Sequence, residues 1–319
     1  MSSVQTGKQL DHYIIGELIA RTDTASIYRG ADVRSGRPVA LKVPHPEVEG
    51  DLLFYNRFLR EQQICETLDH PAVVKGFADP KRSQIYIAME LAPGRLLREI
   101  LHEQGKLPPD RAVRIVIAIC EALDYIHEQG IVHRDLKPEN LLVDAGDRVK
   151  LVDFGIAAQA GARRLTFGKL SNIMGTPDYI SPEQVKGKRG DQRADIYALG
   201  VMLYEMLTGE IPFPGTTALL RMNSRLANQP VPPRAIDSSI TPELQEIVCR
   251  ALEREPRNRY ADARELANDL RHPDRVRVVE RQELPGQPVP WARRPWFYGM
   301  LLAIPAVIFG LLILVARQS

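Results

Sequence analysis

The spacing of hydrophobic residues changes along the chain from a strand-like to a helical pattern. Residues 13–30, 39–42 and 84–92 hold short apolar runs bounded by turn residues or prolines, which is typical of β-strands. From residue 110 onward, apolar residues mostly recur at the spacing of a helix face. This order predicts an α+β fold with a β-rich N-terminal part and a larger helical part.

Between these strands, residues 51–69 have the pattern of a helix with one buried face. The apolar residues of that face follow steps of four and three around Glu61, and they are Phe54, Phe58, Cys65 and Leu68. A carboxylate inside an apolar stripe needs a cation, because an unpaired buried charge costs several kcal/mol. Lys42, at the end of the strand 39–42, is the expected partner. The alternative is a Glu61 exposed at a frayed edge.

Further helical patterns fill the second part of the chain. Asp110 is placed to cap the first of them, and Gly130 is placed to end it. The predicted segments are residues 110–129, 195–209, 241–253 and 261–271.

The stretch IVHRDLKPENLLVDAGDRVKLVDFG, residues 131–155, combines a polar loop with a β-hairpin. Asp135, Lys137 and Asn140 stand in the loop, and Asp153 follows the second strand of the hairpin. Phosphoryl transfer needs such groups: oxygen ligands for a divalent metal, a carboxylate that orients the attacking hydroxyl, and a cation near the transferred phosphate. Each residue alone could belong to an ordinary polar hairpin loop, but the ordered set favours catalysis.

Composition narrows the function classes. The chain of 319 residues carries 42 basic and 40 acidic side chains, a net charge of +2, which argues against a nucleic-acid partner. Its three cysteines lie far apart without a CxxC motif, so neither a disulfide framework nor a zinc site is expected. The first residues lack the apolar core of a secretory signal peptide.

The spacing of the polar residues resembles the signature of eukaryotic-type (Hanks-type) protein kinases, in the bacterial membrane-anchored kind. Lys137 indicates the serine/threonine branch. The resemblance covers residues 11–271 and implies a bilobal fold, with an N-lobe at residues 1–92 and a C-lobe at residues 93–271. It also implies ATP and Mg²⁺, with Mn²⁺ as an alternative, protein substrates with serine or threonine acceptors, and autophosphorylation, for which a homodimer is one route.

The resemblance assigns the catalytic roles. Asp135 is the base or aligner, Lys137 the cation at the γ-phosphate, and Asn140 and Asp153 are the metal ligands. Lys42, paired with Glu61, holds the α- and β-phosphates. The adenine pocket is implied to consist of Ile19, Ile27, Ala40, Met89, Leu142 and the backbone of Glu90 to Ala92.

The nucleotide loop departs from the family pattern. Ala20, Thr22 and Ala25 stand at its three glycine positions. Glycine is favoured there because a missing Cβ lets backbone N–H groups approach phosphates. The sequence therefore predicts a stiffer and weaker phosphate cover, and the alternative is an ordinary hairpin with no nucleotide role.

Residues 156–182 correspond to the activation loop. By resemblance, Arg134 pairs with a phosphorylated residue of this loop, for which Thr166 and Ser171 are the best acceptors; the alternative is that both are solvated hydroxyls. Thr176 is expected to dock substrate and to bond Asp135 and Lys137.

Three further residues are implied to be structural. Glu183 is expected to form an ion pair with Arg259. Asp195 is expected to accept N–H bonds from the catalytic loop.

The chain ends in a predicted membrane anchor. Residues 272–295 read as a charged, proline-rich linker, and residues 316–319 as a short tail. Residues 296–315 carry no charge and would span roughly 30 Å as a helix, the thickness of a bilayer core. This predicts a single-pass protein of the cell membrane with a cytoplasmic kinase domain, contacting the lipid bilayer through 296–315. A buried soluble helix is the alternative.

Two rival functions remain open at this stage. One is a pseudokinase, a nucleotide-binding or empty scaffold anchored in the membrane, and the other is a membrane adaptor that uses the kinase fold as a spacer. The enzyme is favoured because every charged catalytic position is filled.

Overall fold

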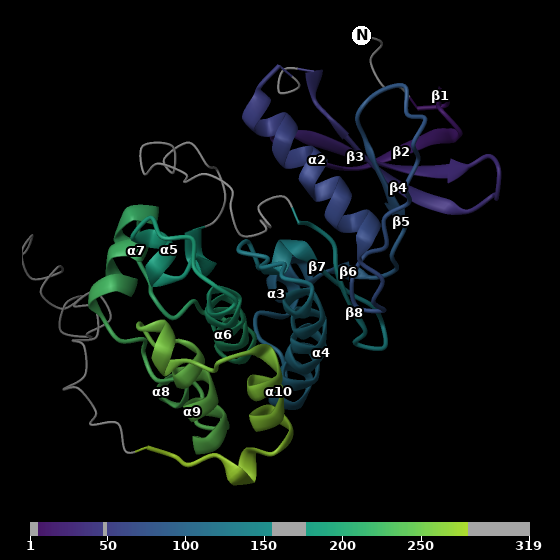
Figure 1. Ribbon diagram of the computed structural model, residues 1–319. Helices are drawn as coiled ribbons and strands as arrows, with labels where there is room; N and C mark the ends of the chain where they lie inside the picture. The colour runs from purple at the N-terminus through teal and green to yellow at the C-terminus, as the bar shows by residue number, and fades with distance from the viewer. Residues whose placement is uncertain (1–5, 47–49, 155–176, 280–319) are drawn as a thin grey trace, which may run out of the picture. The chain divides into compact units, whose positions relative to one another are not determined.

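The computed structural model describes residues 6–46, 50–154 and 177–279, and those up to Val278 belong to one compact unit (Figure 1). Its N-terminal part is an antiparallel sheet with the strands in chain order. The strands are β1 (Gln9–Leu10), β2 (Tyr13–Arg21), β3 (Ala25–Asp32), β4 (Pro38–Pro44) and β5 (Ile87–Glu90). The predicted strand at 84–92 is thus shorter than expected.

Helix α2 (Leu52–Thr67) runs across the sheet (Figure 1). Phe58, Cys65 and Leu68 are at most 2% exposed and belong to the same buried cluster as residues of the sheet. The apolar stripe predicted for residues 51–69 therefore faces the core, and Glu61 lies within it at 4% exposure.

After the sheet, a Pro-Gly break leads into the second lobe. Gly94 has φ +118°, and a Cβ there would lie 2.7 Å from the carbonyl oxygen of Val143. Only glycine fits this turn, since both the dihedral and the close backbone approach exclude a side chain. A small sheet follows, in the order β6 (Arg95–Leu96), β7 (Leu141–Val143) and β8 (Val149–Leu151). The hairpin predicted around residues 144–147 is the β7–β8 pair.

The second lobe is helical. Its helices are α3 (Leu97–Gln104), α4 (Pro109–Glu128), α5 (Pro182–Val185), α6 (Arg193–Thr208), α7 (Ala218–Ala227), α8 (Pro233–Ile236), α9 (Pro242–Ala251) and α10 (Ala263–Arg271). Short 3-10 turns lie at Pro138–Asn140, Pro177–Tyr179, Pro256–Asn258 and Pro273–Arg275. The sequence patterns located α4, α6, α9 and α10, whereas α3, α5, α7 and α8 were not predicted.

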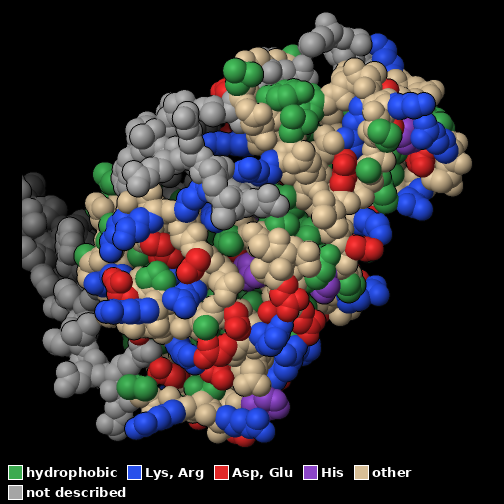
Figure 2. Space-filling view, in the orientation of Figure 1, with side chains coloured by type: hydrophobic (Ala, Val, Ile, Leu, Met, Phe, Trp, Pro, Cys, Tyr) green, Lys and Arg blue, Asp and Glu red, His purple; other side chains and the backbone are tan. Residues whose placement is uncertain are grey.

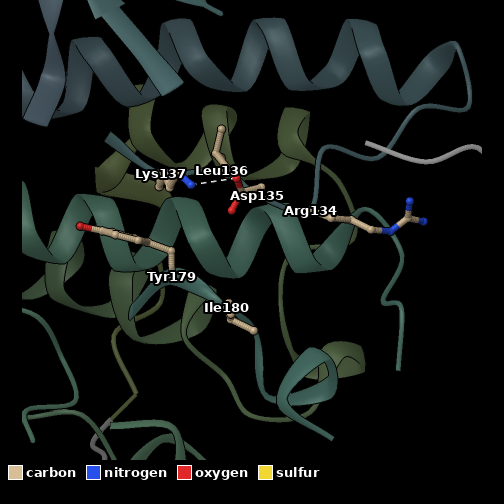
Figure 3. A pocket seen from close by; sticks show the side chains of 6 residues that line it. All are labelled: Arg134, Asp135, Leu136, Lys137, Tyr179 and Ile180. Carbon is tan, nitrogen blue, oxygen red and sulfur yellow. Dashed lines mark hydrogen bonds and ion pairs between the residues drawn. The ribbon is translucent and has the colours of Figure 1, made fainter. Parts of the chain in front are cut away.

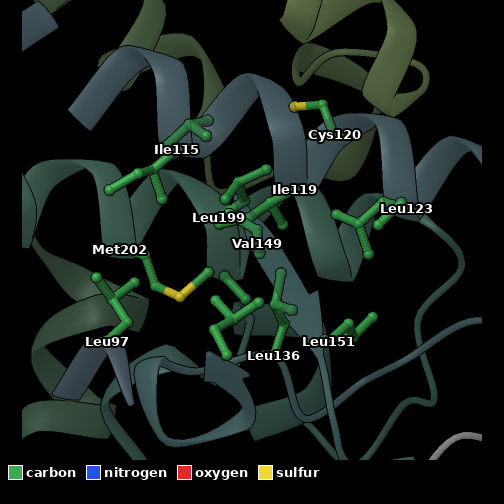
Figure 4. Close-up of a cluster of buried hydrophobic side chains, with 14 of the residues drawn as sticks. Leu97, Ile115, Ile119, Cys120, Leu123, Leu136, Val149, Leu151, Leu199 and Met202 are labelled. Carbon is green, nitrogen blue, oxygen red and sulfur yellow. The ribbon is translucent and has the colours of Figure 1, made fainter. Parts of the chain in front are cut away.

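Helices α4 and α6 pack together in the centre of this lobe. Figure 4 shows Ile115, Ile119 and Leu123 of α4 in one cluster with Leu199 and Met202 of α6. Each of these side chains is fully buried, which is worth about 1.5–3 kcal/mol per residue. Helix α4 is capped differently from the prediction: Pro108 is its N-cap, and Asp110 lies inside the first turn. Its end at Gly130, which has φ +72°, agrees with the prediction.

No helix within 6–46, 50–154 and 177–279 is long and apolar enough to cross a bilayer. The predicted anchor at 296–315, the tail and the linker beyond residue 279 lie outside the described residues. Figure 2 shows acidic and basic side chains interspersed over the face in view, as the small net charge of +2 leads one to expect.

Candidate active site

The carboxylate of Asp195 holds the polar loop between α4 and β7. One oxygen of this fully buried carboxylate accepts the N–H of His133 at 2.9 Å, and the other accepts the N–H of Arg134 at 2.7 Å. His127 Nε2 lies 2.8 Å from the first oxygen. Burial raises the pKa of Asp195, but these bonds outweigh it and the net pKa is lowered. The loop contact predicted for Asp195 is thus present, and it supports Arg134 at φ +65°.

Asp135, Lys137 and Asn140 lie together in this loop. Lys137 Nζ is 2.9 Å from Asp135 Oδ2, and Asn140 Nδ2 donates to the Asp135 carbonyl oxygen at 2.8 Å. A small pocket opens beside them, lined by Arg134, Asp135, Leu136, Lys137, Tyr179 and Ile180 (Figure 3). A hydroxyl entering this pocket would meet a carboxylate with an ammonium group next to it.

Lys42 of β4 connects the two lobes through its contacts with Glu61 and Asp153. Its Nζ lies 2.5 Å from Glu61 Oε1 and 3.3 Å from Asp153 Oδ1. The pair predicted with Glu61 is present, and the second contact was not foreseen. Burial lowers the pKa of Lys42, but Asp153 and Glu61 outweigh it and the net pKa is raised. Lys42 therefore stays a cation. Burial beside Asp153 raises the pKa of Glu61, although Lys42 opposes the shift.

The residues of the predicted metal site fit a hard cation. The Asp153 side chain is 35% exposed, and Asn140 turns its amide nitrogen toward Asp135, which leaves the amide oxygen as the group for a cation. Among the described residues, no group of three or more His, Cys, Asp or Glu side chains is arranged to hold a metal ion by itself. A divalent ion here would therefore complete its oxygen shell with phosphate and water, as Mg²⁺ usually does.

The predicted adenine pocket spans β2, β3, β4, the end of β5 and β7. Ala40 and Met89 are cross-strand neighbours and are buried, at 7% and 6% exposure. Ile19 is exposed, whereas Ile27 and Leu142 are half-buried. The backbone N–H of Glu90 donates to Lys75 O at 2.9 Å. Glu90 can therefore offer an adenine ring only its carbonyl oxygen, and a backbone donor must come from further along, toward Ala92.

The turn without glycine is closed by a threonine side chain. Thr22 Oγ1 accepts the N–H of Ala25 at 3.1 Å and that of Thr24 at 3.4 Å, and it donates to Ala25 O at 3.0 Å. Ala25 is fully buried, whereas Ala20 is exposed in β2 opposite Ile27. Two N–H groups that could meet phosphate are thus bonded within the hairpin.

The ion pair predicted between Glu183 and Arg259 is present and has two contacts. Arg259 Nη1 and Nη2 lie 2.8 and 2.7 Å from the two oxygens of Glu183. Burial raises the pKa of Glu183, but the guanidinium outweighs it and the net pKa is lowered. This pair joins α5 to the segment before α10, and neither residue is among those that line the pocket.

Three predicted residues, Thr166, Ser171 and Thr176, lie outside the described residues. Arg134, the expected partner of a phosphorylated loop residue, is half-buried. Burial and the neighbouring Arg189 lower its pKa.

Some contacts near the site have no signal in the sequence. The carboxylate of Glu90 bonds Lys150 of β8, and it also accepts the N–H of Lys75 at 3.0 Å. Arg98 lies 2.9 Å from Glu139 and 2.7 Å from Glu205, and it also contacts the hydroxyl of Tyr179. These partners are distant in sequence, and no local pattern marks them.

Comparison with known proteins gives one consistent result. A protein kinase domain family model matches residues 13–271. The serine/threonine-protein kinase PknB of Mycolicibacterium smegmatis is 38% identical over 277 residues, 85% of this chain and 44% of the relative. PknB of Mycobacterium tuberculosis is 37% identical over 82% of the chain and 42% of the relative. PknL of Mycobacterium tuberculosis is 38% identical over 88% of the chain and 69% of the relative. The chain thus spans less than half the length of the PknB relatives.

Proposed function

The chain belongs to the Hanks-type serine/threonine branch of the protein kinase family, and we propose that it transfers the γ-phosphoryl group of ATP to serine or threonine hydroxyls of proteins. One observation carries this proposal: every charged position that phosphoryl transfer requires is occupied, and these side chains form two sets of contacts. Asp135 contacts Lys137 at 2.9 Å, and Lys42 contacts both Glu61 and Asp153.

The roles follow from these contacts. Asp135 accepts a hydrogen bond from the substrate hydroxyl and orients the hydroxyl oxygen toward the γ-phosphate. Lys137 beside it balances the charge that develops on the transferred phosphoryl group. Lys42 stays protonated between two carboxylates and holds the nonreacting phosphates. Protein kinases use ATP with a divalent metal; here we propose Mg²⁺, with Mn²⁺ as an alternative, bound by Asn140 and Asp153. The metal neutralises phosphate charge when bound.

A second candidate, a pseudokinase scaffold, is favoured by the closed turn at Thr22. The bonds of its hydroxyl compete with phosphate for two backbone N–H groups. The filled catalytic positions support the enzyme over this rival.

Transfer of labelled phosphate by the full chain to casein and to itself tests the proposal. We expect Asp135→Asn and Lys42→Ala to lower the rate at least about 100-fold, because each removes a group that acts in the transition state. Asp144→Asn, in the exposed turn of the same hairpin, is the matched control and should keep the rate. Incorporation no higher in the parent protein than in Asp135→Asn, with either metal, would leave the scaffold as the function.

Finer features are also part of the proposal. We place the N-lobe at 1–92, the C-lobe at 93–271, the linker at 272–295, and a membrane helix at 296–315 that anchors a cytoplasmic kinase in the cell membrane. The support is the uncharged run of twenty residues. Autophosphorylation on Thr166 or Ser171, in trans within a homodimer, is supported by Arg134 next to Asp135.

A further inference from the structure

Two arginines of helix α7 (Ala218–Ala227) form hydrogen bonds with the segment that makes one wall of the pocket. Arg221 and Arg225 stand four residues apart, so they share one face of the helix. Both donate hydrogen bonds to residues 178–180. This segment includes Tyr179 and Ile180, which line the pocket.

Arg225 is almost completely buried, at 2% exposure. Its Nη1 donates to the carbonyl oxygen of Ile180 at 2.5 Å, and its Nη2 donates to that of Asp178 at 2.6 Å. The guanidinium lies 6.0 Å from the ring centre of Tyr197 and 5.9 Å from that of Phe213. Burying a cation is costly, and burial lowers the pKa of Arg225. A planar guanidinium with several donors offsets this cost by bonding two carbonyl oxygens of the same short segment.

Arg221 holds the same segment by its side chain. Its Nε lies 2.5 Å from Asp178 Oδ1, and its Nη1 donates to Gly215 O at 3.0 Å. Asp178 is thus bound twice from α7, by its carboxylate and by its carbonyl oxygen.

The segment 178–180 lies on the side of the site where the hydroxyl of a protein substrate would bind. Figure 3 shows Tyr179 and Ile180 across the pocket from Asp135 and Lys137. The hydroxyl of Tyr179 is held separately by Glu205 of α6 at 2.5 Å. The groups around Lys42, which face the nucleotide, belong to other elements: Lys42 lies in β4, Glu61 in α2, and Asp153 just after β8.

We propose that Arg221 and Arg225 are positioning residues for the protein substrate, which fix the wall at residues 178–180 at the distance from Asp135 that an acceptor chain requires. The inference rests on the proposed kinase function. It assigns to α7 an effect on the protein substrate and none on ATP.

The test compares Arg221→Gln, Asp178→Asn and their double variant in the full chain, with casein as the acceptor. Losing one charge-assisted contact should raise the KM for casein by roughly three- to tenfold in each single variant. The KM for ATP should stay unchanged, and the double variant should be no worse than either single one, because the two residues share one contact. Arg264→Gln removes an exposed ion pair of α10 and is the matched control, expected to change neither KM.

Amide hydrogen exchange of residues 178–181, measured on the same proteins, reports how firmly the wall is held, independently of catalysis. Exchange should be faster in Arg221→Gln and unchanged in Arg264→Gln. Exchange should also be faster in Arg225→Met. Arg225→Lys should reverse part of this increase, because an ammonium group can reach one of the two carbonyl oxygens. If the parent chain itself transfers no phosphate, the kinase proposal fails, while hydrogen exchange still tests whether the arginines hold the wall. Equal rises in both KM values, unchanged KM values, or unchanged exchange would overturn the positioning role.

Discussion

The hydroxyl of Thr22 decides how the turn between β2 and β3 is closed. A missing glycine could weaken phosphate binding in two ways, through the bulk of a β-branched side chain or through the N–H groups that the hydroxyl engages. Thr22 Oγ1 accepts the N–H of Ala25 at 3.1 Å and that of Thr24 at 3.4 Å, which supports the second cause. Ala25 is buried in β3, so glycine there would also weaken the strand.

Thr22→Gly should therefore lower the KM for ATP several-fold, with kcat less affected. Freeing one or two N–H groups for phosphate is worth about 1–3 kcal/mol, less the ordering entropy of a more mobile turn. Thr22→Val keeps the bulk without the hydroxyl, and Thr22→Ser keeps the hydroxyl with less bulk. Steady-state kinetics against ATP distinguish the two causes. An unchanged KM in an active Thr22→Gly enzyme would show that this turn reaches ATP without glycine.

Among the secondary-structure elements, α5 depends on one buried ion pair. Glu183 of α5 and Arg259 lie in contact at two points, and the Arg259 guanidinium also donates to the carbonyl oxygens of Glu253 at 2.7 Å and Arg193 at 2.9 Å. This single side chain connects α5, the start of α6 and the turn before α10. Its loss would leave a carboxylate and several carbonyl oxygens without their donor.

Arg259→Met should destabilise the C-lobe by about 3–5 kcal/mol near pH 7. The pKa of Glu183 is lower in the folded chain than its ordinary value near 4.5. Its pair is therefore fully stabilising above that value, and its contribution is lost as the pH falls through the folded pKa. Urea unfolding at several pH values should show the gap between wild type and variant narrowing in acid. Glu183→Gln, which keeps the shape without the charge, should show a flatter acid profile; a gap that stays constant below pH 4.5 would contradict the assignment.

At the scale of the whole molecule, the proposed anchor separates a catalytic unit from a membrane segment. We expect the full chain to sediment with membranes and to resist carbonate extraction, because twenty uncharged residues match the bilayer core. Deleting residues 296–319 should release the protein, whereas deleting only 316–319 should not. A full chain that remains monomeric and soluble without detergent would refute the anchor.

The two lobes also meet through contacts outside the catalytic groups. Glu90 at the end of β5 bonds Lys150 of β8, three residues before Asp153. Leu151 of β8 donates to Ala72 O, and Val74 donates to Leu151 O, both at 2.9 Å. The strand that presents Asp153 is therefore held by the segment that follows α2, the helix that carries Glu61.

Much of the site could be predicted from the sequence because its residues are local or lie in a periodic pattern. Asp135, Lys137 and Asn140 stand within six residues of one another, so the backbone of one loop brings them together. Glu61 could be matched to Lys42 because a carboxylate in the middle of an apolar stripe demands a buried cation. Gly130 and Gly209 mark helix ends through their positive φ of 72° and 75°.

The tertiary structure alone decided the contacts whose partners no local pattern marks. Arg225 meets Ile180 from 45 residues away, Arg98 meets Glu205 from 107 residues away, and Lys42 meets Asp153 from 111 residues away. On the sequence, each arginine resembles a solvated residue of an ordinary helix, because helical spacing reports which face is apolar and not what that face packs against. Which carboxylate or carbonyl lies opposite depends on how helices and strands pack, and that packing also fixes Tyr179 and Ile180 beside Asp135.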